Sequence, residues 1–176
     1  MEPEGYISVD IEAAGPIPGE FSMLSVGACF VYNLSNTFYA ELKPINKNFH
    51  PEALKVAGFS LEELEQTGEM PDIAMRNFES WIKKSKGRPV FVGFNATFDW
   101  QFINYYFVRF LGRNPFGISG LDIKAYYMGK FGKNWAETSK SKIPNFLKSG
   151  RQHTHNALDD AMEQAELFRN IITVRL

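Results

Sequence analysis

Asp10 and Glu12, separated by Ile11 and preceded by the apolar residues 6–9, are the side chains of this sequence best suited to chemistry. Side chains two positions apart on a strand lie on the same face, so the pattern places two carboxylates side by side at the end of a buried strand. Such charges repel each other, and a divalent cation between them favours both anionic forms. The pair therefore predicts a metal site, with two solvated surface acids as the alternative.

A further candidate ligand, Asp99, follows the apolar residues 89–94 and falls in the first turn of an expected helix. Strand ends and helix starts are where open α/β sheets place functional groups. An Asp in this position also stabilises a helix through the helix dipole, which is the structural alternative. Both interpretations of Asp99 can hold together.

Near the C-terminus, Asp159 and Asp160 compete for a place in the same site. They lie in the first turns of the last expected helix, about 100° apart around its axis, so only one can easily face a shared centre. His155 lies at or just before that helix. His153 and His50 are the alternative histidines.

Composition limits the class of protein. A length of 176 residues fits one domain, residues 1–176, and 44% hydrophobic with 22% charged residues is typical of a globular chain. The net charge of −1 argues against binding nucleic acid by bulk charge, although a local basic patch remains compatible with it. The lone Cys29 excludes an intrachain disulfide, and no segment resembles a leader or a membrane span. We expect a cytoplasmic protein with no membrane partner.

The order of the expected elements predicts an α/β fold with a mixed sheet of about five strands flanked by helices. The first three strands are expected to be antiparallel, with a hairpin turn at residues 33–36, and the strand at 89–94 leads directly into a helix, as in a parallel crossover. The expected strands are residues 5–10, 24–32, 37–42 and 89–94, and the expected helices are residues 61–65, a longer one from 71, residues 98–111 and the last segment.

Three segments, in this order, resemble the motifs of the DEDDh superfamily of 3′-to-5′ exonucleases. That group includes the proofreading subunit of bacterial replicative polymerase, ribonuclease T and oligoribonuclease. The likeness runs from residue 6 to about residue 172 and implies a ribonuclease-H-like fold. The segments are Asp10-Ile11-Glu12, Asn95-Ala96-Thr97-Phe98-Asp99 and His155-Asn156-Ala157-Leu158-Asp159-Asp160-Ala161.

This resemblance implies that Asp10, Glu12, Asp99 and Asp160 hold two divalent ions. The family's spacing between its histidine and its last acid selects His155 over His153 and Asp160 over Asp159. Oxygen ligands without Cys or paired His favour Mg2+ or Mn2+ over zinc.

The same resemblance implies hydrolysis from a 3′ end, with release of nucleoside 5′-monophosphates by a two-metal mechanism. Asp10 is expected to bridge the ions and Asp99 to support the second ion. Glu12 and Asp160 are expected to complete the catalytic site that holds the attacking water. His155 is expected to accept the proton of that water, because the ordinary pKa of histidine, about 6.5, lies near working pH.

The sequence indicates the residues that contact the substrate less clearly than the metal ligands. In enzymes of this kind the backbone after the first motif contacts the terminal nucleotide, which makes Ala14 and Gly15 candidates, with Ile17 as an apolar wedge and Phe98 beside it. Residues 130–151 hold six basic residues against one acid, and form either a phosphate-binding segment or a solvated loop. We expect a nucleic acid with a free, single-stranded 3′ end as the partner. Several relatives are dimers, so a homodimer is also an expectation.

Two departures from the family leave the choice between RNA and DNA open. Phe94 stands where ribonuclease T and the proofreading subunit carry a histidine, and Ala13 and Ala14 replace two threonines. Neither removes a metal ligand. The rival interpretations are an inactive nucleic-acid-binding protein of the same fold and a phosphohydrolase of small phosphate esters.

Overall fold

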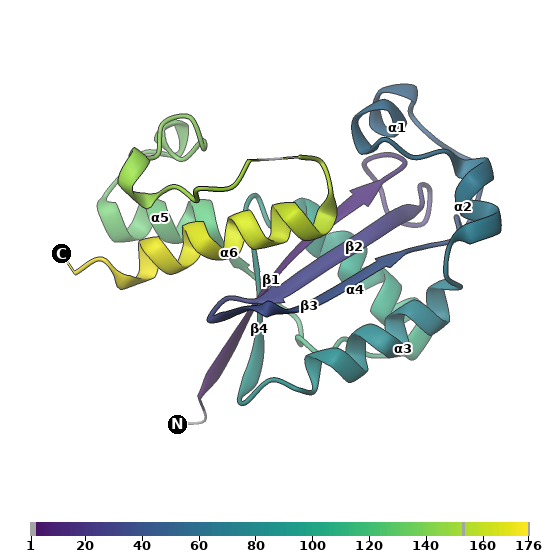
Figure 1. Ribbon diagram of the computed structural model, residues 1–176, viewed down its shortest axis with the longest axis horizontal. Coiled ribbons are helices and arrows are strands. Elements are labelled where there is room, and N and C mark those ends of the chain that lie inside the picture. The colour runs from purple at the N-terminus through teal and green to yellow at the C-terminus, as the bar shows by residue number, and fades with distance from the viewer. Residues whose placement is uncertain (1–2, 153, 176) are drawn as a thin grey trace.

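The computed structural model describes residues 3–152 and 154–175, and its centre is one five-stranded mixed sheet in the order β3-β2-β1-β4-β5 (Figure 1). The central strand β1 is antiparallel to β2 and parallel to β4, and β3 is antiparallel to β2. The expected mixed sheet with three antiparallel strands at its start is therefore confirmed. The strands are β1 (Glu4–Ala13), β2 (Met23–Phe30), β3 (Asn33–Glu41), β4 (Arg88–Gly93) and β5 (Leu121–Asp122).

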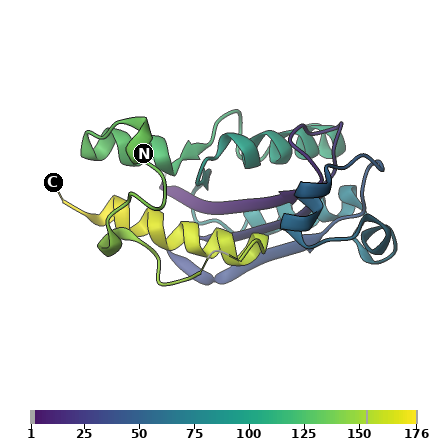
Figure 2. The same ribbon diagram turned by 90° about the horizontal axis from the view of Figure 1, so that it is seen from above.

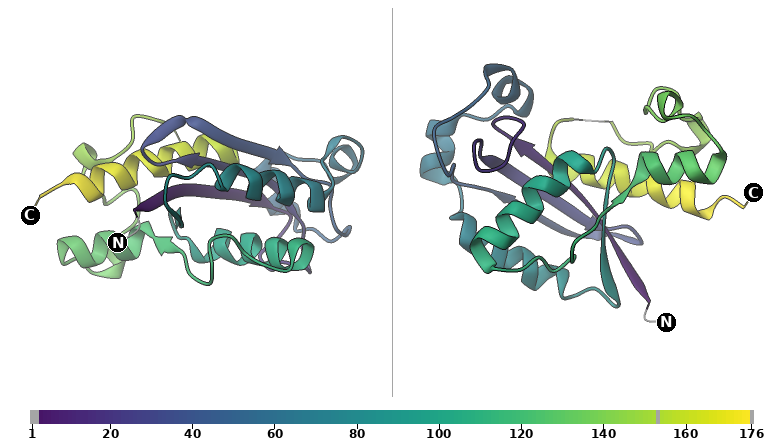
Figure 3. Two further views of the ribbon diagram at one scale, coloured as in Figure 1. Left: turned by 90° about the horizontal axis from the view of Figure 1, so that it is seen from below. Right: turned by 180° about the vertical axis from the view of Figure 1, so that it is seen from behind.

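Helices cover both faces of this sheet (Figures 2 and 3). Helices α3 and α4 pack with the odd-numbered residues of β1 into an aromatic-rich core. Helix α6 crosses the opposite face, where it shares a second core with α5. The helices are α1 (Pro51–Ala57), α2 (Leu61–Thr67), α3 (Pro71–Ile82), α4 (Thr97–Leu111), α5 (Ile123–Phe131) and α6 (Ala157–Thr173), with 3-10 helices η1 (Trp135–Glu137) and η2 (Asn145–Leu147).

The alternation of β1 explains this arrangement. Ile7, Val9 and Ile11 are buried on the α3/α4 face, so the residues between them, including Asp10, face α6. The two carboxylates of the first motif are therefore directed to the same face as the last helix.

Two local expectations were wrong. Residues 33–36 lie inside β3, and the hairpin turns at residues 31–32, because Asn33 already pairs with Phe30. Residues 130–151 are not one loop: they contain the end of α5 and both 3-10 helices, because Ile143 and Leu147 are buried against α6. No helix among the described residues has both the length and the apolar character needed to cross a bilayer.

Candidate active site

The first motif lies inside strand β1, close to its C-terminal end. In the antiparallel register Asp10 is opposite Gly27 and Glu12 is opposite Ser25, and the pairing becomes irregular directly after Glu12. The two side chains share one face because they are two positions apart. As whole residues, Asp10 and Glu12 are both partly accessible.

Asp99 is fixed to that strand by a hydrogen bond beyond the point where the pairing of β1 with β4 ends. The parallel pairing of β1 with β4 ends at Ser8 and Val92, and beyond that point Asp99 Oδ1 accepts a hydrogen bond from the backbone N–H of Ile11 at 3.0 Å. Asp99 is almost fully buried in the first turn of α4. The second motif is thereby held against the first.

The third motif wraps around a buried carboxylate. Asp160 is fully buried, and its two oxygens accept hydrogen bonds from the backbone N–H groups of Thr154 at 2.9 Å and His155 at 3.0 Å. His155 has a backbone φ of +57°, a left-handed conformation that is uncommon for a residue other than glycine. Asp160 therefore stabilises the loop conformation that presents the imidazole.

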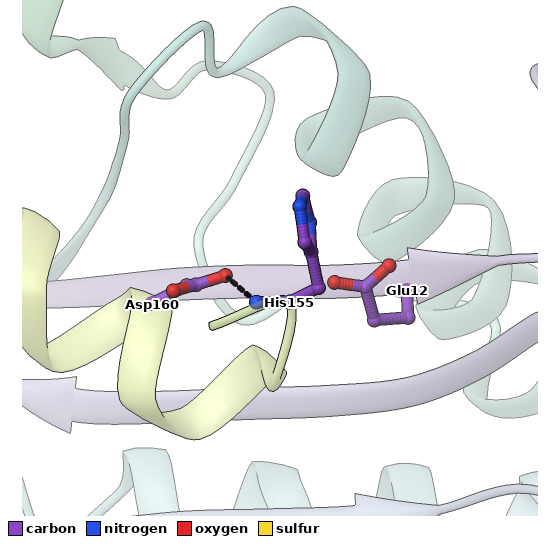
Figure 4. Close-up of side chains that lie close together, drawn as sticks. All are labelled: Glu12, His155 and Asp160. Carbon is purple, nitrogen blue, oxygen red and sulfur yellow. Dashed lines mark hydrogen bonds between the residues drawn. The ribbon is translucent and has the colours of Figure 1, made fainter. Parts of the chain in front are cut away.

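Glu12, His155 and Asp160 meet at one point. Each offers one ligand atom, and these three atoms lie within 4.8 Å of one another. Figure 4 shows the His155 side chain rising between the two carboxylates. The competing Asp159 is exposed and accepts a hydrogen bond from the Thr154 hydroxyl at 3.4 Å, whereas His153 lies outside the described residues.

Two residues with no motif of their own complete the assembly. A Cβ added to Gly27 would lie 2.2 Å from backbone atoms of Ala157 and Leu158, so the start of α6 rests directly on strand β2 beside Asp10. Gln164, also on α6, donates from Nε2 to Asp10 Oδ1 at 2.5 Å and accepts from the backbone N–H of Phe94 at 2.8 Å. Neither residue is marked by a sequence motif, because both roles exist only once the helix and the sheet have met.

The electrostatics of the cluster favour a cation. Burial raises the pKa of Asp10 well above its ordinary range, and the charges of Asp99, Glu12 and Asp160 raise it further, while the hydrogen bond from Gln164 lowers it. Burial, followed by the charges of Asp160 and Asp99, raises the pKa of Glu12 to about 8. Burial also raises the pKa of Asp99. Carboxylates that resist ionisation together are stabilised in their charged form by a divalent ion.

The chemistry of these donors also limits the kind of ion. Every carboxylate in the cluster offers oxygen, and the thiol of Cys29 is buried, where it donates to the carbonyl of Ala161 at 3.6 Å. Oxygen donors suit hard cations such as Mg2+ and Mn2+ better than soft ones. The residues present therefore fit a hard divalent metal.

The expected substrate-binding residues differ in exposure. Ile17 is exposed on the loop after β1, as a wedge against a base requires, and Phe98 is partly buried against the core. Ala14 is fully buried, its N–H bonds to Ser22 and its carbonyl accepts from the backbone N–H of His50. Gly15 is also buried, beneath the ring of Phe21. Ile17 is thus the most accessible of the four predicted contacts.

Most of the basic side chains in residues 130–151 have hydrogen-bond or ion-pair partners within the fold. Two of its basic side chains form ion pairs with α6, Lys140 with Glu163 and Arg151 with Glu166. Other lysines of the segment bind carbonyls or acids within the fold, namely Lys130, Lys133 and Lys142. Of the two interpretations of this segment, these contacts favour a structural role for most of its basic residues over phosphate binding.

Comparison with known proteins places these features in a family. Residues 7–168 match the family model RNase_T, described as exonuclease. The chain is 50% identical over 171 residues to the 3′-5′ DNA exonuclease Cap18 of Escherichia coli, and the match covers 96% of this chain and 91% of that protein.

Solved structures with the same fold are much more distant in sequence. Exonuclease I of E. coli, in complex with a dT13 oligonucleotide, superposes with a TM-score of 0.74 at 15% identity, covering 98% of this chain and 42% of that one. The nuclease domain of 3′hExo, a DEDDh family member bound to rAMP, has a TM-score of 0.72 at 16% identity, covering 93% of this chain and 90% of that one. This chain thus spans less than half the length of exonuclease I. At these identities the likeness shows the fold.

Proposed function

The chain belongs to the RNase_T exonuclease family and is a 3′-to-5′ exonuclease of the DEDDh type, and from this premise we propose that it degrades single-stranded DNA with Mg2+ or Mn2+. The family uses divalent metal ions and acts on nucleic acid. The assignment of the metal, the strand and the individual site residues is the proposal.

We propose Asp10, Glu12, Asp99 and Asp160 as the ligands of two ions. Glu12 and Asp160 have ligand atoms within 4.8 Å of each other, and Asp99 is hydrogen-bonded to β1 between Asp10 and Glu12. Burial, and after it the charges of the neighbouring acids, raises the pKa of Asp10 and of Glu12, and a bound cation would offset both effects. When bound, such ions neutralise the charge that develops on the phosphoryl and leaving oxygens and make the attacking water more acidic. Gln164 keeps Asp10 in place from α6.

His155 is the proposed general base. Its ring stands beside Glu12 and Asp160, and it would take one proton from the water whose oxygen attacks the phosphorus. The new P–O bond forms as the bond to the 3′ oxygen of the preceding nucleotide breaks, and that oxygen takes a proton from solvent. The products are a nucleoside 5′-monophosphate and a strand one nucleotide shorter. Ile17 would rest against the terminal base.

The single observation that carries this mechanism is the convergence of Glu12, His155 and Asp160, whose ligand atoms come from β1 and from both sides of the α6 N-terminus. The preference for DNA rests on a separate support, namely the half-identical relative named as a DNA exonuclease. The two parts of the proposal can therefore fail independently.

The test uses 3′-labelled and 5′-labelled single-stranded oligonucleotides of DNA and of RNA, with Mg2+, with Mn2+ and with EDTA. We expect the wild type to release labelled mononucleotide from the 3′ end of DNA, and EDTA to abolish the release. Asp160→Asn should remove almost all activity, while Asp159→Asn, its exposed neighbour, should act like the wild type. Full activity of Asp160→Asn or of His155→Ala would refute the assigned site, and faster release from RNA would refute the preference for DNA.

The same assay separates the rival functions. A phosphohydrolase of small esters would act on a generic phosphate monoester and leave the oligonucleotide intact, whereas an inactive binding protein would retain the oligonucleotide without cleaving it. We further propose that residues 1–176 act as a single exonuclease domain in the cytoplasm. Sedimentation velocity would test the expected homodimer.

A further inference from the structure

A cluster of aromatic and basic side chains lies beside the carboxylates and has no part in the proposed hydrolysis. It consists of Phe94, Lys124, Trp135 and Lys140, here named the aromatic–lysine cluster. The Lys124 Nζ lies 4.2 Å from the centre of the Trp135 ring and 6.0 Å from that of Phe94, and the Lys140 Nζ lies 5.2 Å from the Phe94 ring. These are cation–π distances, so the rings hold both cations in place.

The cluster is connected to the candidate active site by short links. The backbone N–H of Phe94 bonds to Gln164, the residue that donates to Asp10. The Lys124 Nζ donates to Asn95 Oδ1 at 3.4 Å, and Asn95 opens the segment that ends at Asp99. A nucleic acid strand that passes the carboxylates on this side therefore meets the cluster next.

Among the described residues, Lys124 differs from the neighbouring Lys140 in its ion pairing. Lys140 is neutralised by an ion pair with Glu163, whereas none of the ion pairs among the described residues includes Lys124. Its side chain is only partly accessible and its ammonium group is fixed by Trp135. A positioned cation with no carboxylate partner is suited to a phosphate.

The indole of Trp135 is also available. The side chain is 54% exposed, although the residue begins the 3-10 helix η1. Its backbone carbonyl, rather than the indole, accepts the hydrogen bonds from Thr138 that close this turn. Asn134 and Glu137 form the capping box that secures the turn at its start. The ring is therefore not required by the hydrogen bonds that hold η1 together, and it offers an accessible aromatic surface.

Building on the exonuclease function proposed above, we propose that Trp135 stacks on an unpaired base of the substrate strand beyond the catalytic centre, and that Lys124 binds the adjoining phosphate. Aromatic faces accept any unpaired base, whereas a base in a duplex is already stacked and less able to offer its face. The cluster would thus favour single-stranded substrates of more than one nucleotide, with little preference among sequences.

The test compares a substrate long enough to reach the cluster with one that is too short to reach it. One is a single-stranded DNA decamer, and the other is the p-nitrophenyl ester of thymidine 5′-monophosphate, which has one nucleotide. Trp135→Ala should raise KM for the decamer by about 5- to 100-fold, the equivalent of about 1 to 3 kcal/mol for one stacked base. Its kcat/KM for the ester should stay within about twofold of the wild type, and Trp135→Phe should restore most of the binding of the decamer.

Matched variants separate stacking from a structural role. Phe146→Ala removes an aromatic side chain that is 72% exposed in η2, on the same segment of the chain, and should leave both substrates unaffected. Lys124→Gln should lower the salt dependence of decamer binding by about one counterion.

An unchanged KM for the decamer in Trp135→Ala would overturn the inference, and so would equal losses on the decamer and the ester, which would indicate a structural role. If the wild-type protein cleaves neither substrate, the failure is that of the exonuclease proposal.

Discussion

Gly27→Ala tests whether the close approach of α6 to β2 builds the active site. The added Cβ would lie 2.2 Å from the backbone of Ala157 and Leu158, where ordinary contact begins at 3.4 Å. Backbone atoms cannot rotate away as a side chain does, so the first turn of α6 must retreat by about 1 Å. Asp160 lies on that turn, whereas Asp10 stays opposite residue 27 in the sheet. The substitution should separate the acids of the two motifs.

The effects on activity and on folding are of similar size, and they can be measured separately. A displacement of about 1 Å at a catalytic centre lowers the rate by roughly 100-fold, whereas overpacking of a core typically costs about 1 to 3 kcal/mol of stability. We therefore expect kcat on single-stranded DNA to fall by about 100-fold in a protein that still folds cooperatively. Release of 3′-terminal nucleotide measures the first effect, and thermal unfolding followed by circular dichroism measures the second.

Gly129→Ala is the matched control. Gly129 lies in α5, and a Cβ there would meet no atom within 4 Å. Alanine in a helix is about 0.5 to 1 kcal/mol more favourable than glycine, so this variant should be slightly more stable and fully active. A folded Gly27→Ala protein that keeps its activity within about threefold of wild type would show that the positions of the acids do not depend on this contact.

Two further predictions concern the carboxylates themselves. Because the pKa of Glu12 is raised to about 8, the metal-free protein should lose stability as pH rises from about 4.5 to 8. At pH 8.5 in EDTA, Glu12→Gln should therefore unfold at a higher temperature than the wild type. Its free energy of unfolding should be larger by about 2 to 3 kcal/mol, after allowance for partial exposure of Glu12. The difference should vanish near pH 4.5, and a wild type that is the more stable at pH 8.5 would contradict it. Gln164→Leu removes the hydrogen bond to Asp10, so metal affinity measured by titration calorimetry should fall by about 10- to 100-fold, and an unchanged affinity would contradict this role.

Regular periodicity made most of the fold predictable from sequence. The alternation of residues 5–10 and the apolar stripe of the last helix each define a buried face, and the structure contains both elements. Helix α5 was not predicted, because its nine residues include Gly129 and have no clear apolar stripe. A usable signal was Asp122, whose side chain caps the helix by accepting from the N–H of Ala125 at 2.7 Å.

The candidate site was predictable only where it is encoded as a motif. Acids and a histidine at fixed spacing can be recognised in one dimension, which is how Asp10 and His155 were selected. Gly27 and Gln164 have no such spacing, because the need for a missing side chain or for an amide arises only when α6 lies on the sheet. Lys124 and Trp135 are eleven residues apart, and no regular periodicity connects them. Tertiary contacts therefore determine the supports of the site, even where local sequence determines its reactive groups.

The position of the proposed general base follows from an electrostatic balance in the same cluster. His155 has a left-handed backbone, and the Asp160 carboxylate stabilises it by accepting from the N–H groups of Thr154 and His155. These N–H groups are also partial positive charges, so they offset some of the repulsion that Asp160 exerts on Glu12. The loop and the carboxylate thus stabilise each other before any cation arrives. Asp160 therefore serves both as a proposed ligand and as the residue that orients the base, which is why its removal should cost more than the loss of one ligand.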